Sequence, residues 1–380
     1  MNDLKKLHES LTRLLSLAEQ DPENWTLRAD LFDRALALGE IDLARAQAEL
    51  ALRAQPQDGP WRHRLAVTLL AQRRFPEAQA AFEALVASGI EDPAVRHNLA
   101  FALFSQELMV EAAATVEAFV SGGRDPSGAA LALWLRCQHR LGRLAEGLAA
   151  FRREATEHAV SADACGVASL MAIDADNLEE ARKLSEIALR ERPDQLEALV
   201  AHGTVALADQ QAGPALAAFE LALGRNGSDG RSWSGLGTAK LLAGDLGAAQ
   251  EAFRRAVTHM PGHVGTWIAF GWSLVLGGKV REAQEAFEAA LRLDRNFPES
   301  HGALAVALAR LGERERAEHE IEVARRLDPA GLSARYARAV LDGVADDPGA
   351  VLQLLQQIRT QRGGTGFQKA ERILRGAAGH

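Results

Sequence analysis

The stretch GRSWSGLGTAKLLAGDLGAAQEAFRRAVTHMPGH, residues 230–263, decides the fold of this chain. It places Gly235, Gly237 and Lys240 close together, which suggests either a loop that cradles a phosphate or small residues where helices touch. A phosphate loop needs the pattern Gly-x-x-x-x-Gly-Lys-Ser/Thr between a strand and a helix. The stretch lacks that spacing, so it favours packing between helices.

A pattern of side-chain sizes recurs along the chain every 34 residues. Windows in register without gaps begin at Gly128, Ala162, Leu196, Gly230, Val264 and Pro298. One extra residue near the Gly-Gly pair at 122–123 precedes them, and the earlier windows begin at Trp25, Gly59 and Pro93. A degenerate window begins at Leu332. Self-similarity at this period predicts an array of repeats in which each repeat packs against its neighbours.

The size of the side chain at a few positions of each repeat carries the register. Position 20 is small in Ala44, Ala78, Ala112, Gly147, Ala181, Ala215, Ala249, Ala283 and Ala317. Position 24 is large in Phe82, Phe151, Phe219, Phe253 and Phe287. Position 8 is small in Ala66, Ala100, Gly203, Gly237, Gly271 and Ala305, and position 32 is often proline, which ends a helix. Each repeat is therefore predicted to be a helical hairpin, with looser packing where Gly147 and Ser185 depart from the pattern.

This pattern resembles the tetratricopeptide repeat. The resemblance covers residues 25–331 as nine repeats, with a degenerate tenth over 332–365. It implies an all-α protein, a right-handed α-solenoid of about ten helical hairpins that forms one superhelix over residues 1–380. Residues 1–24 are then an N-terminal capping helix, and residues 366–380 are a C-terminal helix or tail.

Composition excludes several classes of protein. The 380 residues carry a net charge of -8, which argues against a general nucleic-acid binder. The chain has no run of about 18 apolar residues and no signal peptide, so we expect a cytoplasmic protein without membrane insertion. The excess of arginine over lysine is typical of a GC-rich bacterial genome. Cys137 and Cys165 are too few for a disulfide framework and are expected to be buried thiols.

Motifs for catalysis and for metal binding are missing from the sequence. No Gly-x-Ser-x-Gly elbow occurs, and no pair of carboxylates stands out. His63 and His97 occupy adjacent repeats, whose first helices lie roughly 10 Å apart, which is long for two ligands of one ion. His259 and His263 flank Pro261 and therefore do not form a helical pair. We predict a protein that is not an enzyme, with no catalytic, cofactor or metal site.

The resemblance implies that the first helix of each repeat lines a concave face, which binds an extended peptide or a helix. The concave positions first give a polar, basic stretch with two aromatic residues: His63, Arg64, His97, Asn98, Phe101, Phe104, Arg136, His139 and Arg140. A mostly apolar stretch follows: Leu170, Thr204, Thr238, Leu241, Ile268, Trp272 and Val275. This asymmetry predicts a ligand with an acidic end and a hydrophobic part. The alternative is that the aliphatic side chains are buried within each hairpin and that the charges are merely solvated.

Two features have a functional and a structural interpretation. Trp272 occupies position 9 and is either an anchor for a partner or a packing residue against the next repeat. The arginines at position 4 of the first three repeats, Arg28, Arg62 and Arg96, form either a ladder that pairs with carboxylates or stems that pack along the repeats. For the arginines the second interpretation is favoured. Of the two-carboxylate clamp known in chaperone-binding members of the family, only Asn98 is present, which makes that role doubtful.

The predicted function is that of a non-enzymatic adaptor, scaffold or chaperone-like protein that holds a peptide or helical segment of a partner protein in its groove. One alternative is an accessory subunit that positions an enzyme or a component of a secretion or envelope assembly machine. Another is a self-assembling scaffold whose groove holds a second copy of the chain. Neither a cofactor nor a nucleic acid is expected as a partner.

Overall fold

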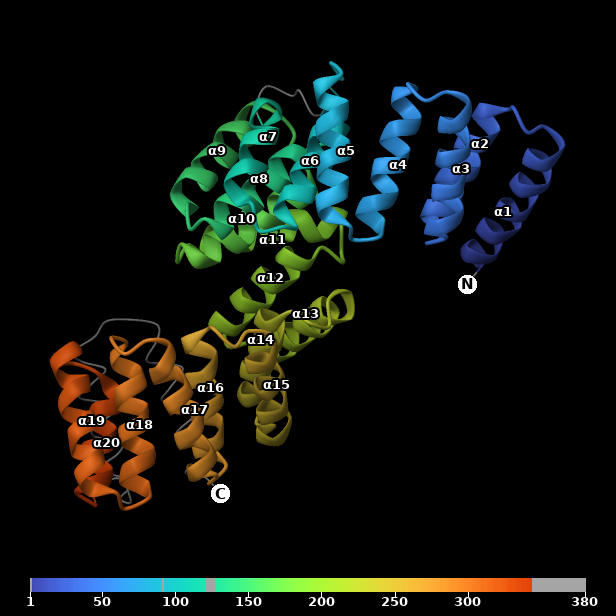
Figure 1. Ribbon diagram of the computed structural model, residues 1–380. Helices are drawn as coiled ribbons and strands as arrows, with labels where there is room; N and C mark the ends of the chain where they lie inside the picture. The colour runs from blue at the N-terminus through green and yellow to red at the C-terminus, as the bar shows by residue number, and fades with distance from the viewer. Residues whose placement is uncertain (1, 91, 121–126, 344–380) are drawn as a thin grey trace. The chain divides into compact units, whose positions relative to one another are not determined.

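The computed structural model describes residues 2–90, 92–120 and 127–343, and every regular element in these ranges is a helix (Figure 1). The predicted second helix of the tenth repeat, within 344–365, and the predicted tail, 366–380, lie outside the described residues. The chain divides into two compact units, Met1–Asp176 and Asn177–His380, which we call the N-terminal unit and the C-terminal unit. The all-α prediction is confirmed, because every regular element of the described residues is a helix and helices pack pairwise as hairpins within each unit.

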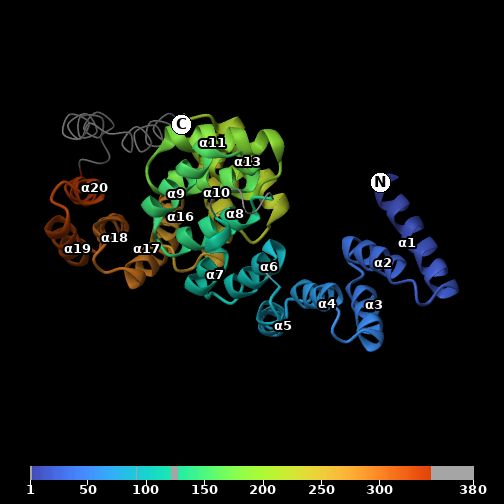
Figure 2. The ribbon, with the colours of Figure 1, turned by 90° about the horizontal axis from the view of Figure 1, so that it is seen from above.

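The N-terminal unit begins with a single helix that packs on the first hairpin, and hairpins follow one another along the chain (Figure 2). Its helices are α1 (Asn2–Gln20), α2 (Trp25–Ala37), α3 (Ile41–Ala54), α4 (Gly59–Ala71), α5 (Phe75–Ala87), α6 (Pro93–Phe104), α7 (Met109–Val116), α8 (Ala129–Arg140), α9 (Leu144–Glu157) and α10 (Ala162–Asp174). A 3-10 helix, η1 (Glu117–Phe119), continues α7.

The C-terminal unit is built in the same way. Its helices are α11 (Leu178–Glu191), α12 (Leu196–Ala208), α13 (Ala212–Arg225), α14 (Gly230–Leu242), α15 (Leu246–His259), α16 (Val264–Leu276), α17 (Val280–Leu293), α18 (Pro298–Arg310), α19 (Arg314–Leu327) and α20 (Leu332–Leu341). In the described part of the chain, every helix is too short or too polar to cross a bilayer.

The turn between the two helices of a repeat has the same backbone conformation in all nine complete repeats. Position 15 has a positive φ each time, as in Gly244 (φ 82°), which separates α14 from α15. Glycine adopts this left-handed conformation without a steric penalty. In four repeats the position is instead occupied by Arg73, Glu107, Asp176 or Gln210, also with a positive φ. The period of 34 residues is therefore visible in the backbone as well as in the side chains.

Glycines and phenylalanines fit together in the core of the C-terminal unit. A Cβ atom on Gly271 would lie 2.3 Å from Cε1 of Phe287, and one on Gly237 would lie 2.9 Å from Cδ1 of Phe253. Both pairs join position 8 of the first helix to position 24 of the second helix, and both phenylalanines are almost fully buried. The small residue thus leaves the space that the phenyl ring fills, as close packing requires.

This packing settles the question raised by residues 230–263. Gly235 and Gly237 lie inside helix α14, and a Cβ on Gly235 would lie 2.2 Å from Cζ of Phe219 in the preceding repeat. Lys240 is on the same helix and pairs with Glu220 at 3.4 Å. The glycines are therefore contact points between helices, and Lys240 is part of a surface ion pair.

Two repeats of the N-terminal unit keep the fit with other residues. In the first repeat the sizes are reversed, because Phe32 stands at position 8 and Ala48 at position 24, and both are buried. In the fourth repeat, Cε of Met171 from α10 lies 2.4 Å from where a Cβ on Gly147 would be. The looser packing predicted at Gly147 is therefore wrong, since a methionine side chain from the next repeat fills the space.

Candidate protein-binding surface

The first helices of the repeats line the inner surface of each unit. In the N-terminal unit, contacts join α4 to α6, α6 to α8, and α8 to α10. In the C-terminal unit they join α12, α14, α16, α18 and α20 in succession. Consecutive second helices, such as α13 and α15, show no comparable approach among the described residues. Since the first helices approach each other more closely, they form the inner side of each unit.

His63 and Asn98, both predicted binding residues, contact each other across two repeats. The side-chain amide of Asn98 lies 3.2 Å from Nε2 of His63. Burial lowers the pKa of His63, the charge of Arg64 lowers it as well, and Asp92 opposes both effects. The ring of His63 also packs edge-on against the buried Phe82, with 5.8 Å between the ring centroids. His63 is therefore a partly buried neutral group near pH 7 rather than part of a positive patch.

The predicted basic residues have acidic partners in the neighbouring repeat. Arg64 lies 3.7 Å from Asp33, and its guanidinium group stacks 4.9 Å from the ring centroid of Trp61. Nε2 of His139 lies 2.6 Å from Asp174. These contacts join neighbouring first helices along the inner surface.

Arg140 makes a similar contact with the preceding repeat. It lies 2.6 Å from Glu107 in the turn after α6. Together the three acidic partners, Asp33, Glu107 and Asp174, offset much of the positive charge that the sequence suggested. Sequence reasoning missed them, although each lies about one repeat length away from its basic partner.

Phe101 is the one large apolar side chain among the predicted residues that is exposed on the described surface, with 41% of its area accessible. It shares the inner face of α6 with His97, Asn98 and Phe104, which lie three or four residues away and are partly buried. Arg136, at the same position of the next repeat, is also partly buried. The structure thus brings an apolar ring into a polar surface.

The predicted apolar stretch is mostly packed inside the hairpins. Leu170 in the N-terminal unit is buried, as are Ile268 and Val275 in the C-terminal unit. Leu241 packs against the core that contains Val275. The hydroxyl groups of two further predicted residues donate to carbonyl groups of their own helices, Thr204 to Val200 and Thr238 to Ser234. These positions offer little free apolar surface.

Trp272 is partly buried between repeats. Its ring packs 5.7 Å from Phe287 and 6.4 Å from Tyr336, measured between centroids. Its indole N–H lies 3.3 Å from the carboxylate of Glu299 on α18. Sequence reasoning missed Glu299 and Tyr336 because the contact depends on how closely α18 and α20 approach each other.

Arg28 holds the first helix in place. It is only 8% exposed, and it donates to the carbonyl of Pro22 and to the side chain of Gln47, both at 2.6 Å. A longer contact at 3.5 Å reaches the carbonyl of Ala18 in α1. The functional interpretation, an arginine ladder that pairs with carboxylates of a partner, is thus wrong for Arg28. Its guanidinium group makes hydrogen bonds inside the protein.

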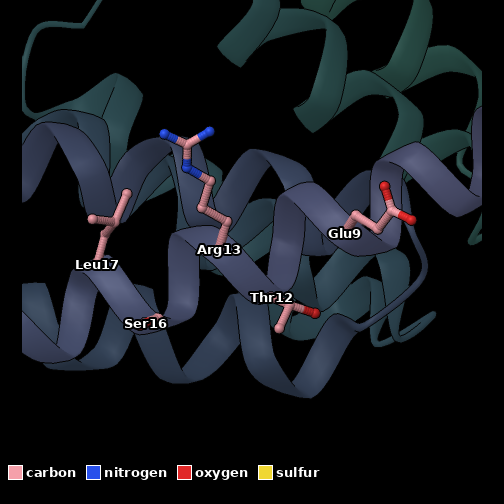
Figure 3. A pocket seen from close by; sticks show the side chains of 5 residues that line it. All are labelled: Glu9, Thr12, Arg13, Ser16 and Leu17. Atoms are coloured by element: carbon pink, nitrogen blue, oxygen red, sulfur yellow. The ribbon is translucent and has the colours of Figure 1, made fainter.

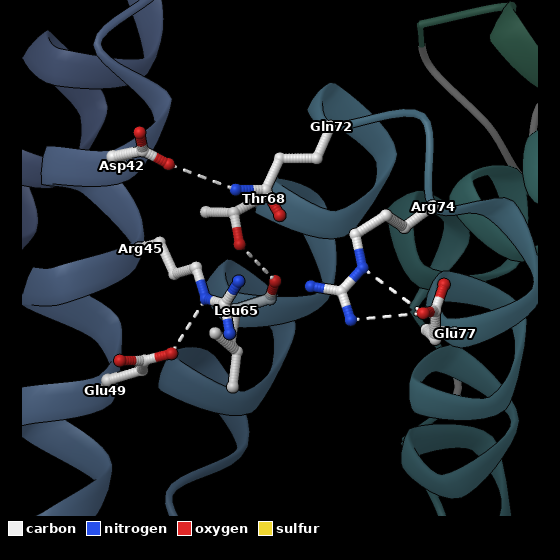
Figure 4. Close-up of polar contacts among 8 residues, drawn as sticks. All are labelled: Asp42, Arg45, Glu49, Leu65, Thr68, Gln72, Arg74 and Glu77. Carbon is white, nitrogen blue, oxygen red and sulfur yellow. Dashed lines mark hydrogen bonds and ion pairs between the residues drawn. The ribbon is translucent and has the colours of Figure 1, made fainter.

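Several other polar contacts in the N-terminal unit lie within a helix or between adjacent helices (Figure 4). Gln72 after α4 donates to Asp42 of α3 at 3.3 Å, Arg45 pairs with Glu49, and Arg74 pairs with Glu77. A shallow depression on α1 is lined by residues of that helix alone: Glu9, Thr12, Arg13, Ser16 and Leu17 (Figure 3). Its walls are too few to enclose a ligand.

Within the described ranges, His, Cys, Asp and Glu side chains do not gather in groups of three that could hold a metal ion. Both cysteines are buried, and burial raises the pKa of Cys137 to about 11. A thiol with a raised pKa is a poor nucleophile near pH 7.

Helical hairpins recur along the chain, and their first helices line an inner surface. These features define a helical repeat protein. The family model described as "Tetratricopeptide repeat" matches residues 63–129 and 268–331. The chain is a tetratricopeptide repeat protein. The comparison with curated proteins gives no match.

Several solved structures are similar to parts of this chain. Pseudomonas aeruginosa pilF is 20% identical, and the match covers 56% of this chain and 96% of that one with a TM-score of 0.43. YrrB, described as a TPR protein with an unusual peptide-binding site, is 22% identical over 50% of this chain and 97% of its own, with a TM-score of 0.40. A tetratricopeptide repeat protein from Parabacteroides merdae is 17% identical over 67% of this chain and 99% of its own, with a TM-score of 0.41.

Proposed function

We propose that the chain is a non-enzymatic adaptor or scaffold of the bacterial cytoplasm, which binds a peptide or helical segment of a partner protein on the inner surface of its repeats. Tetratricopeptide repeats generally serve protein–protein interaction. The inner surface of the N-terminal unit is the best candidate, because its polar side chains are compatible with water and with a reversible partner.

The exposed ring of Phe101 is the observation that carries this proposal. Aromatic side chains are enriched among the residues that contribute most to binding energy. The other large apolar residues predicted on this surface are buried or partly buried, so they are less free to contact a partner. A partner segment that covers Phe101 also meets Asn98 and Arg136, which supply hydrogen bonds and charge around the apolar contact.

Site-specific photocrosslinking in the source organism tests the proposal. A benzophenone amino acid replaces Phe101 in one variant and Val110 in a control variant. Val110 lies on the second helix α7 of the same repeat and is 55% exposed. We expect position 101, but not position 110, to crosslink to one partner protein in stoichiometric yield.

The substitution Phe101→Ala provides the matching loss of function. It should lower recovery of that partner at least tenfold while leaving the thermal unfolding temperature nearly unchanged, because the ring is already exposed. A crosslink from position 101 to a second copy of the chain would favour the self-assembling scaffold instead. Equal crosslinking from both positions would overturn the role of the inner surface.

A further inference from the structure

Three consecutive first helices of the C-terminal unit meet at one carboxylate oxygen. Oε1 of Glu299, in the first turn of α18, accepts the indole N–H of Trp272 from α16 at 3.3 Å. The same oxygen accepts the hydroxyl group of Ser333 from α20. Both donors are neutral, so the negative charge of Glu299 is oriented but not compensated by them.

The other oxygen of this carboxylate is not fully buried. Among the described residues, Oε2 of Glu299 has no hydrogen-bond partner. It is also absent from the set of fully buried polar atoms without a partner, so part of its surface is accessible. No Lys, Arg or His in the described ranges forms an ion pair with Glu299. In the N-terminal unit, by contrast, Asp33, Glu107 and Asp174 each face a basic side chain.

The local electrostatics favour a cation. Burial raises the pKa of Glu299, and the negative charge of Asp328 raises it further against the two hydrogen bonds that lower it. A carboxylate withdrawn from water without a counterion is costly, and a positively charged group that reaches it removes much of that cost. A positively charged group is therefore the ligand chemistry that this carboxylate favours.

The ring of Trp272, whose N–H contacts the carboxylate, lies beside the ring of Tyr336. The rings of Trp272 and Tyr336 lie 6.4 Å apart between centroids and are both partly buried. Arg310 is committed to the hydroxyl group of Tyr336 at 2.8 Å, and it lies 11 residues along α18 from Glu299, roughly 16 Å away. It therefore does not supply the cation. Lysine and arginine side chains carry methylene groups that cover apolar surface and a charge at the tip.

We propose that Glu299 is a recognition site for a lysine or arginine side chain of a partner protein, whose stem packs against Trp272 and Tyr336. The site deepens the proposed function, on which it rests for the nature of its ligand. It predicts that the segment bound along the C-terminal unit is basic at this point. This is opposite in charge to the acidic end that the sequence of the N-terminal unit suggested.

The indole signal of Trp272 reports binding directly, because its N–H contacts Glu299. The full chain is labelled with 15N-tryptophan, and the Trp272 resonance is identified by its absence in Trp272→Phe. The probes are Nα-acetyl-arginine amide and Nα-acetyl-lysine amide. Nα-acetyl-citrulline amide, which has nearly the shape of the arginine probe without its charge, is the control.

We expect both cationic amides to shift the Trp272 resonance in a saturable manner and the citrulline amide to leave it in place. Glu299→Gln keeps an acceptor for Trp272 and Ser333 but removes the charge, and should weaken the response about tenfold. The other five indole resonances should be unchanged, which shows that the variant is folded. Equal shifts with the citrulline amide, or no shift with any probe, would overturn the cation site.

The chain itself contains a competing source of cations. Residues 351–380 include five basic side chains, Arg359, Arg362, Lys369, Arg372 and Arg375. One outcome is that the Trp272 resonance stays in place with the amides but shifts when all five basic residues are replaced by glutamine. That result would assign the site to the chain's own segment and would overturn recognition of a partner protein. A cation response that persists while crosslinking at Phe101 fails would reject the proposed inner-surface function of the N-terminal unit and leave the cation site standing.

Discussion

In the N-terminal unit, neighbouring repeats are joined along the inner surface by pairs of polar side chains, such as Arg140 with Glu107 and His63 with Asn98. In the C-terminal unit, the corresponding helices are joined by aromatic rings and by the carboxylate of Glu299, which has no cationic partner among the described residues. Exposed ion pairs contribute little to stability, whereas buried packing and buried charge have large effects of either sign. The two units therefore share one repeat but should respond very differently to substitution and to salt.

Arg28 belongs to the N-terminal unit, but its polar contacts are buried rather than exposed. Its replacement should therefore have the largest effect on the free energy of unfolding. Arg28→Ala removes three donors from buried or partly buried acceptors, including Gln47 and the carbonyl of Pro22. We expect a loss of about 2–3 kcal/mol in the free energy of unfolding, because hydrogen bonds from charged groups are lost and buried acceptors remain. Hydrogen exchange of α1 should speed up together with urea unfolding. Loss of less than about 0.5 kcal/mol would show that the guanidinium group is solvated.

The next effect tests the fit between glycine and phenylalanine in the C-terminal unit. Gly271→Ala places a methyl group 2.3 Å from Phe287, and overpacking of this kind costs about 1–3 kcal/mol. Alanine recovers up to about 1 kcal/mol of helix propensity, so we expect a net loss of about 1–2 kcal/mol in urea unfolding.

Gly213→Ala is the matched control, because no atom lies within 4 Å of the added Cβ in helix α13. It should be neutral or slightly stabilising. Phe287→Leu combined with Gly271→Ala should restore part of the lost stability, which a double-mutant cycle measures. Equal stability of the two glycine variants would contradict the fit.

A smaller effect, of opposite sign, is expected at Glu299. Its folded-state pKa is raised, so the folded protein holds the proton at pH values where the unfolded chain has lost it. The free energy of unfolding therefore falls as pH rises from the unfolded pKa through the folded one. Glu299→Gln removes this loss and should stabilise the protein by about 1 kcal/mol at neutral pH.

The pH dependence separates this effect from a general gain in packing. Near pH 4, Glu299 is largely protonated in both the folded and the unfolded wild-type chain. The difference in the free energy of unfolding between variant and wild type should therefore nearly vanish. Thermal unfolding at several pH values measures it. An advantage of Glu299→Gln that is the same at low and neutral pH would indicate that the charge is not responsible.

Much of the fold could be predicted from the sequence, because the size of the residue at positions 8, 20 and 24 determines how the two helices of a repeat meet. Gly237 and Phe253 were placed in the helix contact on this basis, and the structure brings them together. The single superhelical domain and its boundaries stay predictions.

The surface was harder to predict, since it depends on contacts between repeats. The environment of Trp272 follows from how closely α18 and α20 pack, which no single repeat encodes. The partner of Arg28 in α1 could not be anticipated because that helix precedes the first full repeat. The polar pairs did leave a signal, because His63 and Asn98 are 35 residues apart, as are His139 and Asp174. Complementary side chains separated by one repeat on first helices are therefore worth searching for.

The smallest effect on stability is expected at the ion pair between Arg140 and Glu107 in the N-terminal unit. Arg140 and Glu107 form a close ion pair, but their side chains are 54% and 71% exposed. Exposed pairs contribute about 0.2–1 kcal/mol, and salt screens them. A double-mutant cycle with Arg140→Gln and Glu107→Gln should therefore give a coupling free energy below about 0.5 kcal/mol that declines further in 1 M salt. A coupling of more than about 1 kcal/mol that resists salt would mean that this pair is withdrawn from water, and the N-terminal unit would then be held together by charge as firmly as the C-terminal unit is by packing.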